Sequence, residues 1–186
     1  MPRCPLVQVH QGFFLCTEAL KGGMIHSGKG IAVRSHFVER SLIILKPDAV
    51  QRGLVSAILG RLEQRGLQIV GLKLMRVTED LARKHYAEHD GKPFFAGLIE
   101  YITSGPVVVI NVKGKNVIET VRTMVGATNP VKAAPGTIRG DYGLEIGRNL
   151  IHASDSPESG ERETAIFFAA NELFTVERSV DRWIYE

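Results

Sequence analysis

The sequence is poor in cysteine and has no long apolar run. Its 186 residues hold two cysteines, Cys4 and Cys16, and both lie in the first sixteen positions. Two cysteines outside the expected core do not make a disulfide scaffold, and no other feature indicates secretion. The longest apolar runs, such as Pro106–Ile110, fall far short of the roughly 20 residues that a membrane-spanning helix needs. We therefore expect a soluble protein without a membrane partner.

A strong excess of one charge is also absent. The 23 basic and 20 acidic residues give a net charge of +3, which is too even to predict a nucleic acid as the main partner. Small anionic molecules are still possible ligands, because binding them requires only a local group of cations. Hydrophobic residues make up 44% and charged residues 23% of the chain, as in an ordinary globular protein. The length suits one domain with a hydrophobic core and additional segments.

Residues 1–40 differ from the rest of the chain, because no helical or strand period runs through them for long. They hold five basic residues against two acidic ones. We interpret them as an N-terminal extension that is flexible or loosely docked. A cleaved targeting peptide is the alternative, so a cytoplasmic location is the default and a mitochondrial or plastid one its competitor. Residues 41–186 then form the folded domain, with a C-terminal tail at 174–186.

The hydrophobic pattern of residues 41–186 predicts a ferredoxin-like fold. Strands are expected at 42–45, 67–77, 107–112 and 150–152, and helices at 54–65, 78–89, 94–103, 117–125 and 156–170. This order reduces to βαββαβ, an α+β fold with helices on one face of an antiparallel sheet. A long loop without a clear period covers residues 127–148, and loops of this length tend to be functional. The tail has no firm assignment, although its aromatic end suggests that it packs on something.

Three short motifs suggest functions that their surroundings do not support. Gly23–Lys29 has the spacing of a phosphate-binding loop, but Gly30 follows where a Ser or Thr would hold a metal. His85 and His89 match the H-x-x-E-H zinc signature and would share a helix face, but no third ligand is obvious, which leaves a zinc hydrolase as a minor alternative. Arg139–Asp141 is an adhesion tripeptide, which is better interpreted as loop chemistry in a chain without secretory features.

A better candidate for chemistry combines dispersed cations with one histidine. The cations lie at a strand end, on a helix and in the long loop, with two polar residues nearby: Lys46, Arg122 and Arg139, with Thr128 and Asn149. Fixed donors of this kind suit phosphate oxygens, although single basic residues are usually solvated surface. His152 ends an apolar run and is followed by small polar residues that leave room beside it. The residues alone leave open whether His152 is a catalyst or a core histidine whose ring nitrogens simply make hydrogen bonds.

Six segments in order resemble the nucleoside diphosphate kinase family, and the similarity runs from about Ser41 to Glu186. They are Lys46–Gly53, Pro93–Phe95, Ser104–Val108, Gly126–Pro130, Pro135–Asp141 and Arg148–Asp155. The last segment, RNLIHASD, is highly specific. The resemblance implies an enzyme that transfers the γ-phosphate of a nucleoside triphosphate, mainly ATP, to a nucleoside diphosphate by a ping-pong route.

The resemblance also implies a role for individual residues. His152 would be the nucleophile, phosphorylated at Nδ1, while Glu163 orients its ring and Ser154 places a hydroxyl beside the two. Lys46 would serve both catalysis and nucleotide binding. The remaining nucleotide-binding positions are Tyr86, Arg122, Thr128, Arg139 and Asn149, with Phe94 and Ile146 as the two sides of a base clamp and Leu98 close by. A clamp of this kind does not read base edges, so both purines and pyrimidines should enter.

Cofactor and assembly follow from the same resemblance. Family members use Mg²⁺, which is held mainly by the nucleotide phosphates, so we assign no protein ligand to it. The loop at 127–148 matches the family's subunit contact and the tail resembles hexameric members, which implies a homohexamer built as a dimer of trimers. The partners are then nucleoside di- and triphosphates, with no nucleic acid or membrane.

The sequence departs from the family pattern at three positions. Ala49 occupies a position where the family usually has a glycine, and Ala153, after the histidine, replaces another common glycine. Lys92 replaces a common arginine. Ala49 would be strained only if its φ were positive. None of these changes removes a catalytic group. An inactive binding or scaffold protein of the same fold is the remaining alternative, weakened by the intact set of expected catalytic residues.

Overall fold

The computed structural model of the chain describes residues 38–186. The predicted extension, apart from its last three residues, and the Gly23–Lys29 motif lie outside the described residues. The first strand begins at Val38, three residues before the expected boundary at Ser41. No helix among the described residues is long and apolar enough to cross a membrane.

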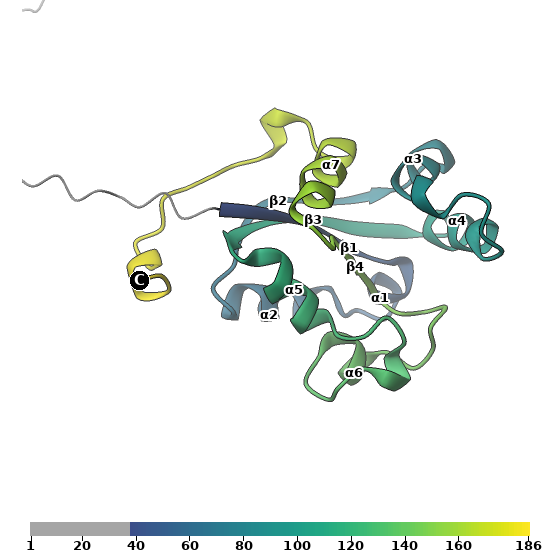
Figure 1. Cartoon of the computed structure of the whole chain (residues 1–186), viewed down its shortest axis with the longest axis horizontal. Coiled ribbons are helices and arrows are strands. Elements are labelled where there is room, and N and C mark those ends of the chain that lie inside the picture. The colour runs from purple at the N-terminus through teal and green to yellow at the C-terminus, as the bar shows by residue number, and fades with distance from the viewer. Residues whose placement is uncertain (1–37) are drawn as a thin grey trace, which may run out of the picture. The chain divides into compact units, whose positions relative to one another are not determined.

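A four-stranded antiparallel sheet forms the centre of the fold, in the order β2-β3-β1-β4 (Figure 1). The strands are β1 (Val38–Leu45), β2 (Gln68–Arg76), β3 (Pro106–Lys115) and β4 (Ile151–Ala153). β4 pairs with the end of β1, where Ile44 lies opposite His152. The predicted ferredoxin-like fold with an antiparallel sheet is confirmed.

Seven α-helices accompany the sheet in the described residues. They are α1 (Pro47–Gln51), α2 (Val55–Gln64), α3 (Glu79–His85), α4 (Phe95–Thr103), α5 (Val117–Val125), α6 (Ile138–Tyr142) and α7 (Pro157–Phe167). Short 3₁₀ turns lie at Ala87–His89, Pro130–Lys132, Ala170–Glu172 and Asp181–Trp183. The last predicted helix is shorter than expected, because Phe168 takes an extended conformation.

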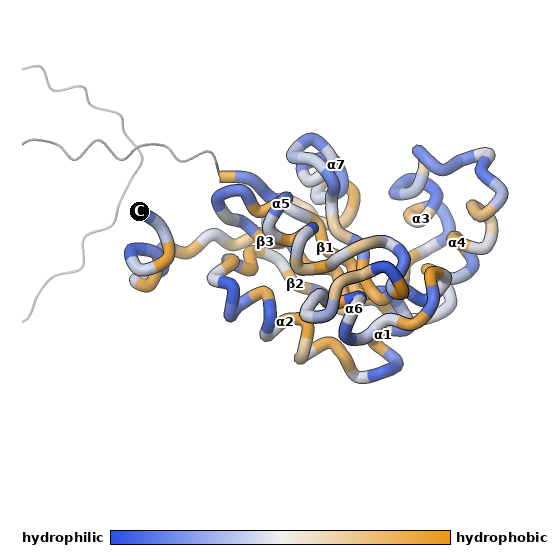
Figure 2. Tube along the Cα trace, turned by 60° about the horizontal axis from the view of Figure 1, so that its bottom comes forward, coloured by the Kyte–Doolittle hydropathy of each residue, from blue (hydrophilic) through white to orange (hydrophobic). Residues whose placement is uncertain are grey.

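The helices cover both faces of the sheet, so the expectation of helices on one face is wrong. Successive side chains of β1 point to opposite sides, and all of them from Leu42 to Leu45 are buried. Leu42 and Ile44 pack with α3, α4 and α7, while Ile43 and Leu45 pack with α2 and α5. Figure 1 shows these two groups of helices above and below the sheet, and Figure 2 shows hydrophilic residues on the outer turns of α7. A continuous apolar run is typical of a strand covered on both sides.

The loop at 127–148 contains structure that its sequence does not reveal. α6 lies in this loop, and Thr137 caps it by accepting a hydrogen bond from the Gly140 N–H at 3.1 Å. Ile138 is fully buried in the core below the sheet, and Asp141 pairs with Arg61 of α2 at 2.9 Å. A helix of five residues is too short to show a period, so a cap and two buried side chains, Ile138 and Arg139, fix it.

The tail packs only in part. Ile184 lies against Gly66, and Arg178 donates to the carbonyl oxygens of Gly66 and Leu67. Trp183, however, is 80% exposed. The aromatic end of the chain therefore leaves a large apolar side chain uncovered.

Candidate functional site

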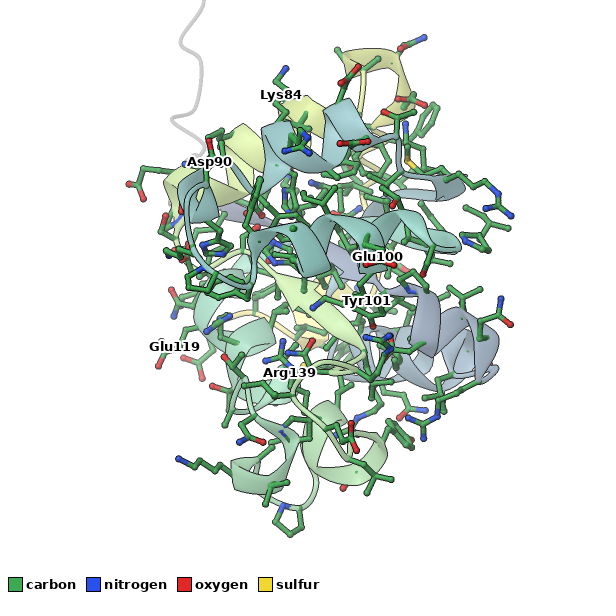
Figure 3. All side chains as sticks on the ribbon, turned by 90° about the vertical axis from the view of Figure 1, so that its right-hand side faces the viewer. Lys84, Asp90, Glu100, Tyr101, Glu119 and Arg139 are labelled. Atoms are coloured by element: carbon green, nitrogen blue, oxygen red, sulfur yellow. The ribbon has the colours of Figure 1, made fainter. Side chains whose placement is uncertain are left out.

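A cavity of about 890 Å³ opens beside β4 and the end of β1. Every site residue expected from the sequence lines it except Ser154, which is fully buried beneath it. Figure 3 views this side of the molecule, where Tyr101 of α4 and Arg139 of α6 are labelled. The fold therefore brings together residues that lie more than a hundred positions apart in the sequence, such as Lys46 and His152.

His152 is held by one carboxylate on one side of its ring. Its Nε2 lies 3.0 Å from Oε2 of Glu163, and the same oxygen accepts a 2.7 Å hydrogen bond from the Ser154 hydroxyl. Burial raises the pKa of Glu163, but the hydrogen bonds from His152 and Ser154 outweigh it and hold the pKa below its ordinary value. An ionised carboxylate only accepts, so the Nε2 atom carries the proton and Nδ1 keeps its lone pair.

A residue with strained backbone, Leu150, lies two positions before His152. Leu150 has a φ of +69°, which is uncommon for a residue with a side chain. Its N–H donates to Oδ2 of Asp48 at 3.1 Å, and its carbonyl accepts from the Lys46 N–H at 2.8 Å. Strain of this kind costs about 1–3 kcal/mol and persists where neighbouring contacts fix it. The segment that follows β1 therefore fixes the turn that leads into β4.

Glu163 depends on a close contact between α7 and β1. Ser156 caps α7 by accepting from the Ser159 N–H at 3.1 Å, and Pro157 occupies the first turn, as the sequence predicts. Gly160 lies where a Cβ atom would overlap the carbonyl oxygen of Arg40 in β1. The helix can therefore approach the strand closely, and Glu163, three residues later, reaches the ring of His152.

Three polar groups at the floor of the cavity are linked through Asn149. The Lys46 ammonium donates to Oδ1 of Asn149 at 2.6 Å, and Nδ2 of Asn149 donates to the Thr128 carbonyl at 3.1 Å. Burial and the nearby Arg139 lower the pKa of Lys46 to about 8, although Asp48 acts in the opposite direction. Within residues 38–186 no carboxylate forms an ion pair with Lys46, and a buried cation of this kind is an attractive site for an anion.

Arg139 is almost fully buried and fixed by main-chain acceptors. Its guanidinium donates to the carbonyl oxygens of Asn149, Gly126 and Ile151 at 3.1, 3.1 and 2.6 Å. Burial and the neighbouring Arg122 lower its pKa to about 10, so it stays charged at neutral pH. The remaining N–H groups of the fork are available for a phosphate oxygen. Arg122 itself is exposed on α5.

Two apolar side chains stand at the mouth of the cavity. Phe94 is 54% exposed and Ile146 is 60% exposed, and Leu98 lies one turn beyond Phe94 on α4. Lys92, which replaces the family's arginine, lies beside this clamp, with its Nζ 5.9 Å from the centre of the Phe94 ring. Exposed apolar groups at a cavity mouth suit a flat ligand that stacks between them.

The zinc interpretation of His85 and His89 is wrong. α3 ends at His85, so the two residues do not share a helix face, and the group of potential metal ligands found in residues 38–186 lacks His89. His89 contacts Lys92 at 3.1 Å instead. His85 is buried with its ring 4.7 Å from that of His152. Tyr86, next in the chain, is buried at the cavity wall, and burial raises its pKa.

Several cavity residues were not predicted from the sequence. Arg148 lies 4.4 Å from the centre of the Tyr101 ring, and Arg162 pairs with Glu88 at 2.6 Å. Arg148 and Arg162 directly precede the predicted Asn149 and Glu163, but nothing in the pattern separates them from solvated surface cations.

The three departures from the family pattern are accommodated. Ala49 lies inside α1, and it is not among the residues with positive φ in the described part of the chain. It is fully buried, so an alanine fits without strain. Ala153 is buried in β4 beside His152.

Comparison with known proteins gives one consistent family. The sequence profile described as nucleoside diphosphate kinase matches residues 39–173. A nucleoside diphosphate kinase of Roseiflexus castenholzii is 74% identical over 149 residues, which cover 80% of this chain and 100% of that protein. One from Archaeoglobus fulgidus is 57% identical, covering 80% of this chain and 99% of that protein.

Solved structures agree with these relatives. A halophilic nucleoside diphosphate kinase from Halobacterium salinarum in complex with CDP is 51% identical with a TM-score of 0.78, covering 80% of this chain and 99% of that one. A nucleoside diphosphate kinase family protein from Babesia bovis is 46% identical with a TM-score of 0.77, covering 79% and 99%. The chain therefore belongs to the nucleoside diphosphate kinase family.

Proposed function

We propose that this enzyme transfers the γ-phosphoryl group between nucleotides through a phosphohistidine at Nδ1 of His152. One observation carries the proposal. The hydrogen bond between Nε2 of His152 and ionised Glu163 places the proton on Nε2, and the lone pair on Nδ1 is available as a nucleophile.

The transfer consists of two half-reactions. Nδ1 attacks the γ-phosphorus of a nucleoside triphosphate, the bond from that phosphorus to the bridging oxygen breaks, and the diphosphate leaves with the electron pair. A second diphosphate then attacks the phosphohistidine, and the nitrogen–phosphorus bond breaks. Positive charge that develops on the imidazole is stabilised by Glu163, whose position Ser154 supports through its 2.7 Å hydrogen bond.

The phosphates are held by fixed donors. Lys46, Arg122 and Arg139 supply positive charge, while Thr128, Asn149 and the hydroxyl of Tyr86 supply hydrogen bonds. Hydrogen bonds hold Lys46, Asn149 and Arg139 in place before the nucleotide arrives, so these groups need little reorganisation when charge develops on the equatorial oxygens.

Mg²⁺ fits this cavity as a companion of the nucleotide. The ion prefers several oxygen ligands, whereas the group of metal-ligating side chains found within residues 38–186 is two imidazoles and one carboxylate. The protein thus lacks an oxygen cage of its own in the described region, and the phosphates would hold the ion. When bound, Mg²⁺ neutralises charge that develops on the phosphates.

Substitution of Phe94 should weaken the binding of all nucleotides to a similar extent. Phe94→Ala is expected to raise KM about tenfold for GDP and CDP, since stacking of a base on an aromatic ring contributes roughly 1–3 kcal/mol. Phe174→Ala removes a similarly exposed ring outside the cavity and should leave KM unchanged. Initial-rate kinetics with both acceptors check this. A loss confined to one base would mean that the ring reads base identity.

The activity should depend on the charge of Lys46. Because its pKa is about 8, the free enzyme loses this charge as the pH rises above 8, and kcat/KM is expected to fall there. A bound phosphate favours the charged form, so kcat should fall only at higher pH. Lys46→Arg keeps its charge and should lack the decline near pH 8, whatever its absolute activity. A decline that survives in this variant would assign it to another group.

The enzyme is further proposed to assemble as a homohexamer, a dimer of trimers. Support comes from apolar side chains left uncovered in one chain. Val131 and Leu144 in the loop at 127–148 are 80% and 79% exposed, and Leu72 and Leu74 are exposed on the edge strand β2. Sedimentation should give six times the 20.5 kDa chain mass, and Leu144→Asp should reduce it. A wild type that sediments as a monomer would contradict the assembly.

Steady-state kinetics distinguish the proposal of an active enzyme from the alternative of an inactive scaffold. With ATP and GDP varied together, a phosphoenzyme route gives parallel double-reciprocal lines, because the first product leaves before the second substrate binds. Intersecting lines would indicate direct transfer in a ternary complex. No turnover by the folded protein would favour the scaffold.

A further inference from the structure

One buried histidine has no role in the transfer described above. His85 is 7% exposed, and neither of its ring nitrogens has a hydrogen-bond partner in the part of the chain that the structure describes. Its ring packs edge-on against Phe167 at 5.2 Å and against His152 at 4.7 Å. A buried polar group without a partner costs about 1–3 kcal/mol, and a phenylalanine could make the same ring contacts without that cost. The imidazole therefore needs a partner that residues 38–186 of one chain do not supply.

The surroundings of His85 indicate what kind of partner this is. His85, His152 and Glu163 each offer a ligand atom, and the three atoms lie within 4.8 Å of one another. Neither ring nitrogen of His85 is used in a hydrogen bond within residues 38–186, so a lone pair of the ring is free to bind a ligand. Neutral imidazole is the form that binds metals.

We propose that His85, Nε2 of His152 and Glu163 form an inhibitory site for a borderline divalent cation such as Zn²⁺. Two histidines and one glutamate, with a fourth position open to water, are a donor set that zinc takes in proteins. The inhibitory effect rests on the proposed role of His152, whereas binding of the metal does not.

A metal at this site would inhibit the transfer because it displaces the proton from Nε2 of His152. In the free enzyme the proton is on Nε2, hydrogen-bonded to Glu163. A metal bonded to Nε2 displaces it, and in a neutral ring it moves to Nδ1. The lone pair that attacks the γ-phosphorus is then lost, with no change in oxidation state and no proton released.

The donor set selects against the ion that accompanies the substrate. Mg²⁺ prefers oxygen ligands, whereas imidazole nitrogens suit Zn²⁺, Co²⁺ and Cu²⁺. A tetrahedral ion with bonds of about 2.1 Å separates its ligand atoms by roughly 3.4 Å, so the ring of His85 would move towards the ion. Lys46 and Arg162 border the same cavity and oppose a cation, which makes the site reversible rather than structural.

A titration of the metal-free full chain with Co²⁺, without nucleotide, tests the binding. We expect visible absorption bands typical of tetrahedral Co²⁺, one ion per chain, and displacement by Zn²⁺. His85→Phe keeps the ring contacts and should lose the bands, while His89→Phe, which changes another cavity histidine, should keep them. Bands that survive in folded His85→Phe, or that carry the strong charge-transfer signal of a thiolate ligand, would overturn the site.

A measurement on the wild type covers the case in which His85→Phe does not fold. Imidazole ¹⁵N spectra should show shifts of both His85 and His152 when Zn²⁺ is added. Shifts confined to other histidines would contradict the proposal.

Phosphorylation separates this inference from the proposed function. Zn²⁺-loaded wild type should take no label from γ-labelled ATP, and a zinc-selective chelator should restore labelling. His85→Phe should label to the same extent with and without Zn²⁺. If metal-free wild type does not label, the proposed function fails and the Co²⁺ bands still decide the site. If metal-free protein labels and the bands do not depend on His85, only the metal site is wrong.

Discussion

His152→Ala is expected to lower phosphoryl transfer on the order of 10⁴-fold or more, the scale of losing a catalytic nucleophile. Other groups in the cavity donate to phosphates, but none of them is an imidazole whose proton is fixed on the far nitrogen by a carboxylate. A coupled assay for GTP formation from ATP and GDP measures the loss.

The control for this prediction is another histidine at the same cavity. His89→Ala removes a ring that contacts Lys92 and Phe94 and is expected to change kcat by only a few-fold. Both variants should unfold at temperatures near that of the wild type, because neither ring is fully buried. Substantial turnover by folded His152→Ala would assign the nucleophile to a different residue.

Arg139→Met is expected to damage both stability and catalysis. Three carbonyl oxygens lose a charged donor in a buried setting, which should cost about 3 kcal/mol. For a domain of this size the melting temperature should fall by roughly 6–12 °C. The loss of a fixed guanidinium at the phosphates should also reduce kcat/KM about a hundredfold.

Arg148→Met provides the matched comparison for Arg139. Arg148 lines the same cavity, but it is exposed, and among the described residues its guanidinium donates only to the carbonyl of its neighbour Gly147. Its loss should leave the melting temperature within about 2 °C of the wild type. The measurements need equal protein concentrations, since assembly affects the melting temperature. Equal losses in both variants would mean that the buried carbonyl contacts of Arg139 contribute little.

The order of strands and helices along the chain could be predicted from the sequence, because long periodic segments identify most of them. The continuous run from Leu42 to Leu45 and the β-branched run in β3 identify buried strands, and Val117–Val125 gives a helix with the predicted bounds. The number of covered faces was predicted wrongly, although the continuous apolar run of β1 already implied burial on both sides. α6 was missed because five residues show no period.

The candidate site could be predicted mainly through the resemblance. Single cations such as Lys46 and Arg122 look like surface residues until the fold brings them to one cavity. A zinc pair of His85 and His89 stayed a minor alternative, because the end of α3 at His85 cannot be recognised from a short motif. The location of the protein, the role of residues 1–40 and the hexamer stay predictions.

Labelling followed by a chase tests the phosphohistidine directly. Wild type and His152→Ala would be incubated with γ-labelled ATP and Mg²⁺, assayed for acid-labile, base-stable label on the protein, and then given unlabelled GDP. We predict that the label forms on the wild type alone and leaves as labelled GTP. A folded wild type that transfers phosphate to GDP without ever carrying the label, or a labelled His152→Ala, would contradict a phosphoenzyme at His152.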